Sequence, residues 1–162
     1  MENLQFKNGK FKILQVSDAQ DMHYVRRSMI KMLNTAYDKL KPDLVLFTGD
    51  NVLSNHLLDA RIGNRQSGKG FNDTFLRMKK SLDYILSPLE KRNIPFAMIF
   101  GNHDDFCCMT KEEILGLYRS YNGFVGLTDT NGEAGTGTYN MLIYSGDKPK
   151  FNLWLMDTSN HI

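Results

Sequence analysis

Apolar residues gather along this chain in two kinds of pattern, typical of buried strands and of amphipathic helices. Runs that are mostly apolar predict strands over residues 11–16, 44–47 and 94–100. Apolar residues spaced three and four apart predict helices in the segments that follow these strands. Two further runs, residues 138–144 and 151–156, flank a Ser-Gly-Asp turn and predict a β-hairpin.

The order of these elements indicates the fold class. Helices are expected over residues 25–40, 71–89 and 111–121, which gives the order β-α-β-α-β-α followed by the hairpin. Pro42 ends the first helix because proline cannot continue it. Strands that alternate with helices predict an α/β fold with a mostly parallel sheet. With 162 residues, the chain is long enough to form a single domain, residues 1–162, around its own core.

A polar cluster follows each of the first three strands, at its carboxyl end. The clusters hold Asp18 and Gln20, then Asp50, then Asn102 and His103. Ligands of parallel sheets bind beyond the carboxyl ends of the strands, so these side chains are expected to meet there. Two carboxylates brought together need a cation or a shared proton, and mixed oxygen and nitrogen donors suit manganese, iron or zinc. The sequence therefore predicts a metal site at this edge.

Composition limits the partners of such a site. The net charge of +2 argues neither for a nucleic-acid binder nor for a polyanionic tail, and no apolar run approaches the roughly 20 residues that span a bilayer. Cys107 and Cys108 are the only cysteines, and neighbours in sequence rarely form a disulfide, which favours a reducing compartment. Residues 1–12 lack the apolar core of a signal peptide. A cytoplasmic protein without a nucleic-acid or membrane partner is expected, with a leader upstream of Met1 left open.

The three clusters resemble the motifs of the calcineurin-like metallophosphoesterases. That family is marked by Asp-x-His, Gly-Asp, Gly-Asn-His-Asp/Glu, a lone His and then Gly-His-x-His. Residues 18–20 (Asp-Ala-Gln) match the first motif with glutamine in place of histidine, residues 49–50 (Gly-Asp) match the second, and residues 101–104 (Gly-Asn-His-Asp) match the third. The surrounding sequence is most similar to the bacterial and purple-acid-phosphatase-like branch, whose fold is a layered sandwich.

The resemblance implies a role for each matching residue. Asp18 and Gln20 would bind one divalent ion, and Asp50 would bridge it to a second ion held by Asn102. His103 would be catalytic, contacting a phosphoryl oxygen or protonating the leaving group. The implied cofactors are two ions of manganese, iron or zinc, with no organic cofactor. The implied reaction is hydrolysis of a small phosphomonoester or phosphodiester by metal-activated water.

The motifs that complete the family pattern do not follow His103. His161 is the only later histidine, and it is not part of Gly-His-x-His. On this comparison the chain corresponds to the N-terminal portion of a longer enzyme, a truncated domain that binds metal weakly or partially and has little activity. Truncation is expected to expose an apolar sheet face or a strand edge, through which a homodimer could form.

Several alternatives stay open at this point. Asp21 and His23 also spell Asp-x-His, although Asp18 follows directly on its strand and is therefore favoured. Residues 63–70 nearly spell a phosphate-binding loop, but glycine replaces the Ser or Thr that should reach magnesium. Asp157, which ends an apolar strand, fits either a support for the site or a simple turn. The competing function is a non-catalytic binding domain, in which Gln20 marks a degenerate site.

Overall fold

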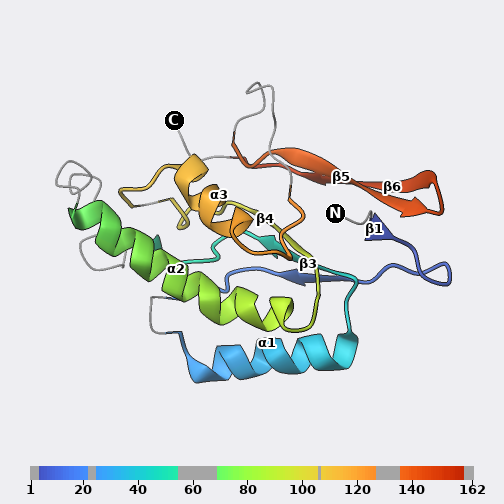
Figure 1. Cartoon of the computed structure of the whole chain (residues 1–162), viewed down its shortest axis with the longest axis horizontal. Helices are drawn as coiled ribbons and strands as arrows, with labels where there is room; N and C mark the ends of the chain where they lie inside the picture. The colour runs from blue at the N-terminus through green and yellow to red at the C-terminus, as the bar shows by residue number, and fades with distance from the viewer. Residues whose placement is uncertain (1–3, 22–24, 55–68, 106, 127–135, 159–162) are drawn as a thin grey trace.

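The structure, a computed structural model, describes residues 4–21, 25–54, 69–105, 107–126 and 136–158. In these ranges two three-stranded sheets and three helices form layers, with one sheet lying between the helices and the other sheet (Figure 1). The elements in chain order are β1 (Leu4–Gln5), β2 (Ile13–Val16), α1 (Arg27–Leu40), β3 (Leu44–Thr48), α2 (Lys69–Glu90), β4 (Phe96–Ile99), α3 (Lys111–Arg119), β5 (Tyr139–Ser145) and β6 (Lys148–Leu155).

The central sheet contains β2, β3 and β4, and all of its strands are parallel, as the apolar runs predict. The register pairs Val16 with Phe47 and Thr48 with Ile99, so the three strands end almost level with one another. The polar clusters that follow these strands are therefore delivered to one edge of the sheet.

The hairpin does not extend the central sheet. Strands β5 and β6 pair antiparallel, and β1 pairs with β5 in parallel, which gives a second sheet of order β1-β5-β6. The sequence pattern does not reveal β1, because it is two residues long, lies in a polar segment and finds its partner strand near the other end of the chain. The α/β class and the layered sandwich are confirmed.

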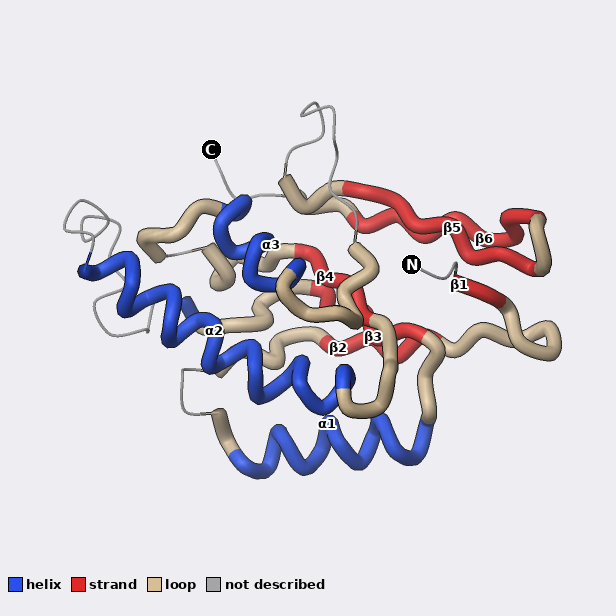
Figure 2. The backbone as a smooth tube through the Cα atoms, viewed as in Figure 1, coloured by secondary structure: helices blue, strands red, loops and turns tan. Residues whose placement is uncertain are grey.

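Alternate residues of the central sheet pack against opposite layers. Figure 2 shows the backbone of these layers, with the helices on one side of the central sheet and the hairpin on the other. Val45 and Phe96 face the helices and belong to the larger core cluster, in which Phe96 also contacts the ring of Phe47. Leu44 and Ala97 face the second sheet, where they pack with residues of the hairpin. Both faces of β3 and β4 are thus covered, which explains why these two strands carry apolar residues without alternation. In β2, by contrast, Ile13 and Gln15 are exposed.

Helix α1 buries a narrower face than its spacing predicts. Leu33 and Tyr37 are buried, whereas Met32 and Leu40, which the periodicity assigns to the core, are 61% and 51% exposed. The helix lies on the outside of the helical layer, so only one stripe of its surface meets other elements (Figure 1). It ends before Pro42, as expected. Among the described residues, no helix is long and apolar enough to cross a membrane.

An open cleft of about 1170 Å³ lies at the amino ends of β3 and β4. Its walls include Leu4 of β1, Lys41 after α1 and Arg92 after α2, together with Pro42 and Pro95 just before the two strands. Its charged side chains are partly neutralised, since Arg92 forms an ion pair with Asp38 at 2.7 Å. The cleft is therefore at the end of the sheet opposite the polar clusters.

Candidate metal centre

The loops that follow β3 and β4 pack backbone against backbone at the carboxyl edge of the central sheet. A Cβ atom on Gly101 would lie 2.2 Å from both the backbone N and the Oδ1 of Asp50. A Cβ on Gly49 would lie 2.9 Å from the Cα of Gly101, and Gly49 has a φ of +100°. Both glycines are therefore required, because a side chain at either position would push the two loops apart.

Two aspartates at this edge adopt the left-handed backbone region. Asp18 has a φ of 55° and Asp50 a φ of 50°, values that cost free energy for residues other than glycine. The backbone N of Asp18 donates to the carbonyl oxygen of Gly49 at 3.2 Å, which places the first loop beside the second. Strain of this kind persists where the surrounding structure holds it, and it is frequent at functional sites.

The side chains of these aspartates are oriented by local donors. Oδ1 of Asp50 accepts a hydrogen bond from the backbone N of His103 at 2.9 Å, which links the loops after β3 and β4. Oδ2 of Asp18 accepts one from the hydroxyl of Ser17. The three loops are thus connected in the order in which the strands lie in the sheet.

Three buried polar atoms near these loops have no hydrogen-bond partner among the described residues. They are Oε1 of Gln20, Oδ1 of Asn51 and Nδ1 of His103. A buried oxygen without a donor is costly, and a cation at that position would satisfy it. Carboxylate and amide oxygens are ligands for hard and borderline divalent ions, so Asp18, Gln20 and Asp50 fit a metal ion chemically.

The metal roles assigned from the sequence stay predictions. Asn102 lies exposed on the loop after β4, next to the residues that carry the link to Asp50. Among the residues that the structure describes, no three His, Cys, Asp or Glu side chains form a group that could hold a metal ion. The candidate donors from this part of the chain are therefore two carboxylates completed by the amides of Gln20 and Asn102.

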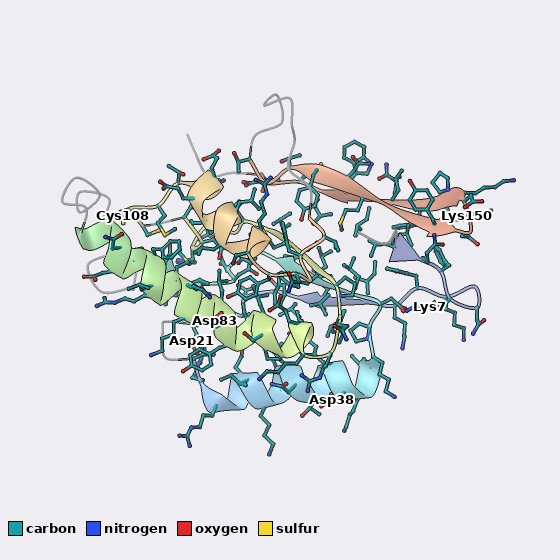
Figure 3. The ribbon with its side chains drawn as sticks, in the orientation of Figure 1. Lys7, Asp21, Asp38, Asp83, Cys108 and Lys150 are labelled. Carbon is teal, nitrogen blue, oxygen red and sulfur yellow. The ribbon has the colours of Figure 1, made fainter. Side chains whose placement is uncertain are left out.

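The competing first motif is only partly visible. His23 lies outside the described residues, but Asp21 is described (Figure 3). Its Oδ2 accepts hydrogen bonds from the backbone N of Arg26 at 2.8 Å and from Nε of the same residue at 3.1 Å. Asp21 thus stabilises the start of α1, whereas the backbone of Asp18 is held beside Gly49. This arrangement favours Asp18.

The candidate phosphate-binding loop also falls largely outside the described residues. Its last two residues, Lys69 and Gly70, form the first turn of α2, and residues 63–68 are not described. The hypothesis that this segment holds a nucleotide stays untested.

Asp104, the last residue of the third motif, has a role that the sequence does not reveal. Its side chain is buried, with 2% exposure, and its two carboxylate oxygens accept hydrogen bonds from Asn51, Val52 and Gly101. Burial raises the pKa of Asp104 to about 7, and the hydrogen bonds that its carboxylate accepts from backbone N–H groups limit the rise. The sequence shows only that an acidic residue follows a short apolar strand. It does not show the hydrogen-bond partners on the loop after β3, which lie about fifty positions earlier in the chain.

Asp157 and the two cysteines have structural contacts. Oδ2 of Asp157 pairs with Nζ of Lys111 at 2.6 Å, which ties the end of β6 to the start of α3. Cys107 and Cys108 are both buried, and the Sγ of Cys108 hydrogen-bonds Thr74 of α2 at 3.3 Å (Figure 3). Burial raises the pKa of Cys107 to about 11, so this thiol stays protonated at neutral pH and is a poor metal ligand.

The strain at Asp18 gives a testable prediction. Asp18→Gly relieves the left-handed conformation, so the metal-free chain should become more stable by about 0.5–1 kcal/mol while its metal affinity falls. Urea unfolding in the presence of a chelator measures the first effect, and Mn²⁺ titration measures the second. Asn8→Gly is the matched control, because Asn8 has a φ of 52° in an exposed turn away from the polar clusters. It should give the gain in stability alone, and a loss of stability in Asp18→Gly would contradict the prediction.

Comparison with known proteins identifies related sequences. A model of the family described as calcineurin-like phosphoesterase matches residues 11–157. The chain is 26% identical, over an alignment of 189 positions, to an Arabidopsis thaliana protein named probable inactive purple acid phosphatase 29, covering 95% of this chain and 42% of that protein. An uncharacterized Schizosaccharomyces pombe protein is 31% identical over 118 residues, covering 73% of this chain and 18% of that protein. The chain is also 27% identical over 124 residues to the Saccharomyces cerevisiae phosphatase DCR2, covering 65% of this chain and 18% of that protein. It thus spans less than half the length of these relatives.

Proposed function

The chain belongs to the calcineurin-like phosphoesterases, and on that premise we propose that the carboxyl edge of its central sheet contributes to a dinuclear metal centre that hydrolyses a small phosphomonoester or phosphodiester. The observation that carries the proposal is the buried, unpartnered Oε1 of Gln20 on the loop that holds Asp18. The strained backbones of Asp18 and Asp50 support it, because both carboxylates are kept where unconstrained loops would not hold them.

In this proposal the residues of the chain have separate tasks. Asp18 and Gln20 would hold one ion, Asn102 would hold the second, and Asp50 would be a ligand shared by both. When bound, two divalent ions would neutralise charge on the phosphoryl group and lower the pKa of a water molecule towards neutrality. The protein's part is to fix the ligands before substrate binds, which it does through the backbone links between the three loops.

His103 is proposed to move a proton rather than to bind metal. Its Nδ1 is buried, so Nε2 is the nitrogen that would meet the substrate. An imidazole has a pKa near neutrality and can give a proton to the departing alkoxide, a step that is typically worth about 10²–10⁴-fold in rate. The backbone N of the same residue holds Asp50, which couples the position of the acid to that of the metal ligand.

A second candidate function is a binding domain that keeps the fold without catalysis. The observation that favours it is Gln20, which stands where the family usually has histidine, together with the printed name of the Arabidopsis relative as a probable inactive phosphatase. In that case the chain would bind a phosphorylated molecule at the same edge without hydrolysing it.

The two functions are distinguished by metal content and turnover. A longer natural protein that carries this chain should retain manganese, iron or zinc and hydrolyse p-nitrophenyl phosphate or its bis ester when that metal is added, whereas the chain alone is expected to bind the metal weakly and to turn over little substrate. Elemental analysis measures the metal, and release of nitrophenol measures turnover. Retained metal without turnover in the longer protein would favour the binding domain. Absence of both metal and turnover would overturn the proposed enzyme.

A further inference from the structure

The carboxylate of Asp104 forms hydrogen bonds to both loops that carry the proposed ligands. Its Oδ1 accepts from the backbone N of Asn51 at 2.7 Å and from that of Val52 at 2.9 Å. Its Oδ2 accepts from the backbone N of Gly101 at 2.7 Å and from Nδ2 of Asn51 at 3.4 Å. One buried side chain therefore holds the segment after Asp50 and the segment before Asn102.

These bonds are reciprocal with the link made by Asp50. Asp50, on the loop after β3, accepts from the backbone N of His103 on the loop after β4. Asp104, on the loop after β4, accepts from two backbone N–H groups on the loop after β3. Each loop thus supplies one carboxylate to the backbone of the other, in the manner of a capping box between two separate loops.

The arrangement also accounts for the conformation of Asp50. This residue has a φ of 50°, and the next two backbone N–H groups are both bound by Asp104. Hydrogen bonds from the peptides directly after a strained residue oppose its relaxation to a right-handed or extended conformation. Asn51 is bound a second time, because its Nδ2 also donates to the carbonyl oxygen of Ile99 at the end of β4.

We propose that Asp104 is a positioning residue of the metal centre, which sets the separation of Asp50 and Asn102 by clamping the loops that carry them. The inference rests on the proposed function, since it concerns the same metal centre. It goes beyond that function by giving the fourth residue of Gly-Asn-His-Asp a task distinct from ligation and from proton transfer. Asp104 acts through backbone atoms and does not touch the metal.

The test is a Co²⁺ titration of the whole chain, followed through the visible absorption bands of the ion. Asp104→Asn keeps the shape of the side chain but turns one accepting oxygen into a donor that faces other N–H groups. The dissociation constant for Co²⁺ should rise by about 10–100-fold, the range typical of residues that support metal ligands. The positions of the absorption bands at saturation should shift as well, because the ligands are no longer held at the same separation.

Two control variants distinguish the effect of misplaced ligands from the effects of a lost negative charge and of a lower stability. Asp105→Asn removes the same charge at the neighbouring position, where the carboxylate lies 3.8 Å from Lys111. Leu86→Ala removes a fully buried side chain from the far end of α2 and lowers stability without touching the loops. Both controls should leave the absorption bands of the saturated protein unchanged. A shift of equal size in either control would overturn the positioning role.

The outcomes distinguish this inference from the proposed function. If the unaltered chain binds no Co²⁺, the proposed function fails and the inference fails with it. If the unaltered chain binds Co²⁺ and Asp104→Asn binds it with the same affinity and spectrum, only the positioning role is overturned. Should Asp104→Asn fail to fold, Asn51→Ala is the second variant, because it removes the side-chain hydrogen bonds of Asn51 and keeps the backbone N–H that Asp104 binds. A smaller rise in the dissociation constant is then expected, and an unchanged value would overturn the inference.

Discussion

We expect Asp50→Ala to weaken metal binding by the chain, with the dissociation constant for Mn²⁺ rising by more than about 100-fold, beyond the range seen when only a supporting residue is lost. The reason is that Asp50 is proposed to lie between both ions, so its loss removes a ligand from each. Oδ1 of Asp50 also holds the backbone N of His103, so the loops after β3 and β4 lose one of their links. Isothermal titration calorimetry of the metal-free chain with Mn²⁺ measures the change.

His103→Ala is the matched control for this prediction. The contact that His103 makes with Asp50 uses its backbone N–H, which an alanine retains. The variant should therefore bind Mn²⁺ as the unaltered chain does, while a longer protein that carries it should lose hydrolytic rate by about 10²–10⁴-fold, the contribution of a general acid. Equal loss of metal affinity in both variants would show that His103 is a ligand and that the assigned roles are wrong.

Gly101→Ala should destabilise the fold by about 1–3 kcal/mol or more, the cost of forcing an additional group into a filled space. The added Cβ would lie 2.2 Å from the backbone N of Asp50, and backbone atoms cannot move aside as a flexible side chain can. Urea unfolding followed by circular dichroism measures the loss. The metal affinity should fall together with the stability, since the loops that carry Asp50 and Asn102 are forced apart.

Gly116→Ala is the control for this second prediction, because a Cβ at Gly116 meets nothing within 4 Å. The residue lies within α3, where alanine is favoured over glycine by roughly 0.5–1 kcal/mol. The control should therefore gain stability while Gly101→Ala loses it. A loss of less than about 0.5 kcal/mol in Gly101→Ala, the size of an ordinary surface substitution, would contradict the close packing of the two loops.

Strands β3 and β4 could be predicted because they are buried on both faces and so leave uninterrupted apolar runs in the sequence, and β2 because its run is mostly apolar. Strand β1 could not, since its two residues, Leu4 and Gln5, are a strand only by virtue of pairing with β5. Met32 and Leu40 were expected in the core because helical spacing indicates a face but does not say how wide a stripe the neighbouring elements cover. Secondary structure set by local periodicity was therefore predictable, and structure set by distant partners was not.

The same distinction applies to the candidate site. Asp18, Gln20, Asp50 and Asn102 could be selected because each follows a strand whose end the pattern locates. The task of Asp104 could not be predicted, because its hydrogen bonds go to backbone N–H groups of Asn51 and Val52, and a backbone donor leaves no trace in the identity of the residue that carries it. The need for glycine at position 101 could not be predicted either, because it arises from the close approach of the backbone of Asp50, which is distant in the sequence.

The close approach of the two loops has a consequence for how the Gly-Asn-His-Asp sequence can be used as a marker. Gly101, Asp104 and the backbone of His103 hold the loops together through contacts that involve no metal ion. Changing these residues would destabilise the fold even in a family member without catalytic activity. Selection for folding alone would therefore preserve most of the motif. Gln20 is under no such requirement, because no hydrogen bond to its buried oxygen is found in the described part of the chain. The residue at a position such as 20 should therefore indicate whether a member of the family is catalytically active, whereas the glycine and the aspartate of the Gly-Asn-His-Asp motif should not.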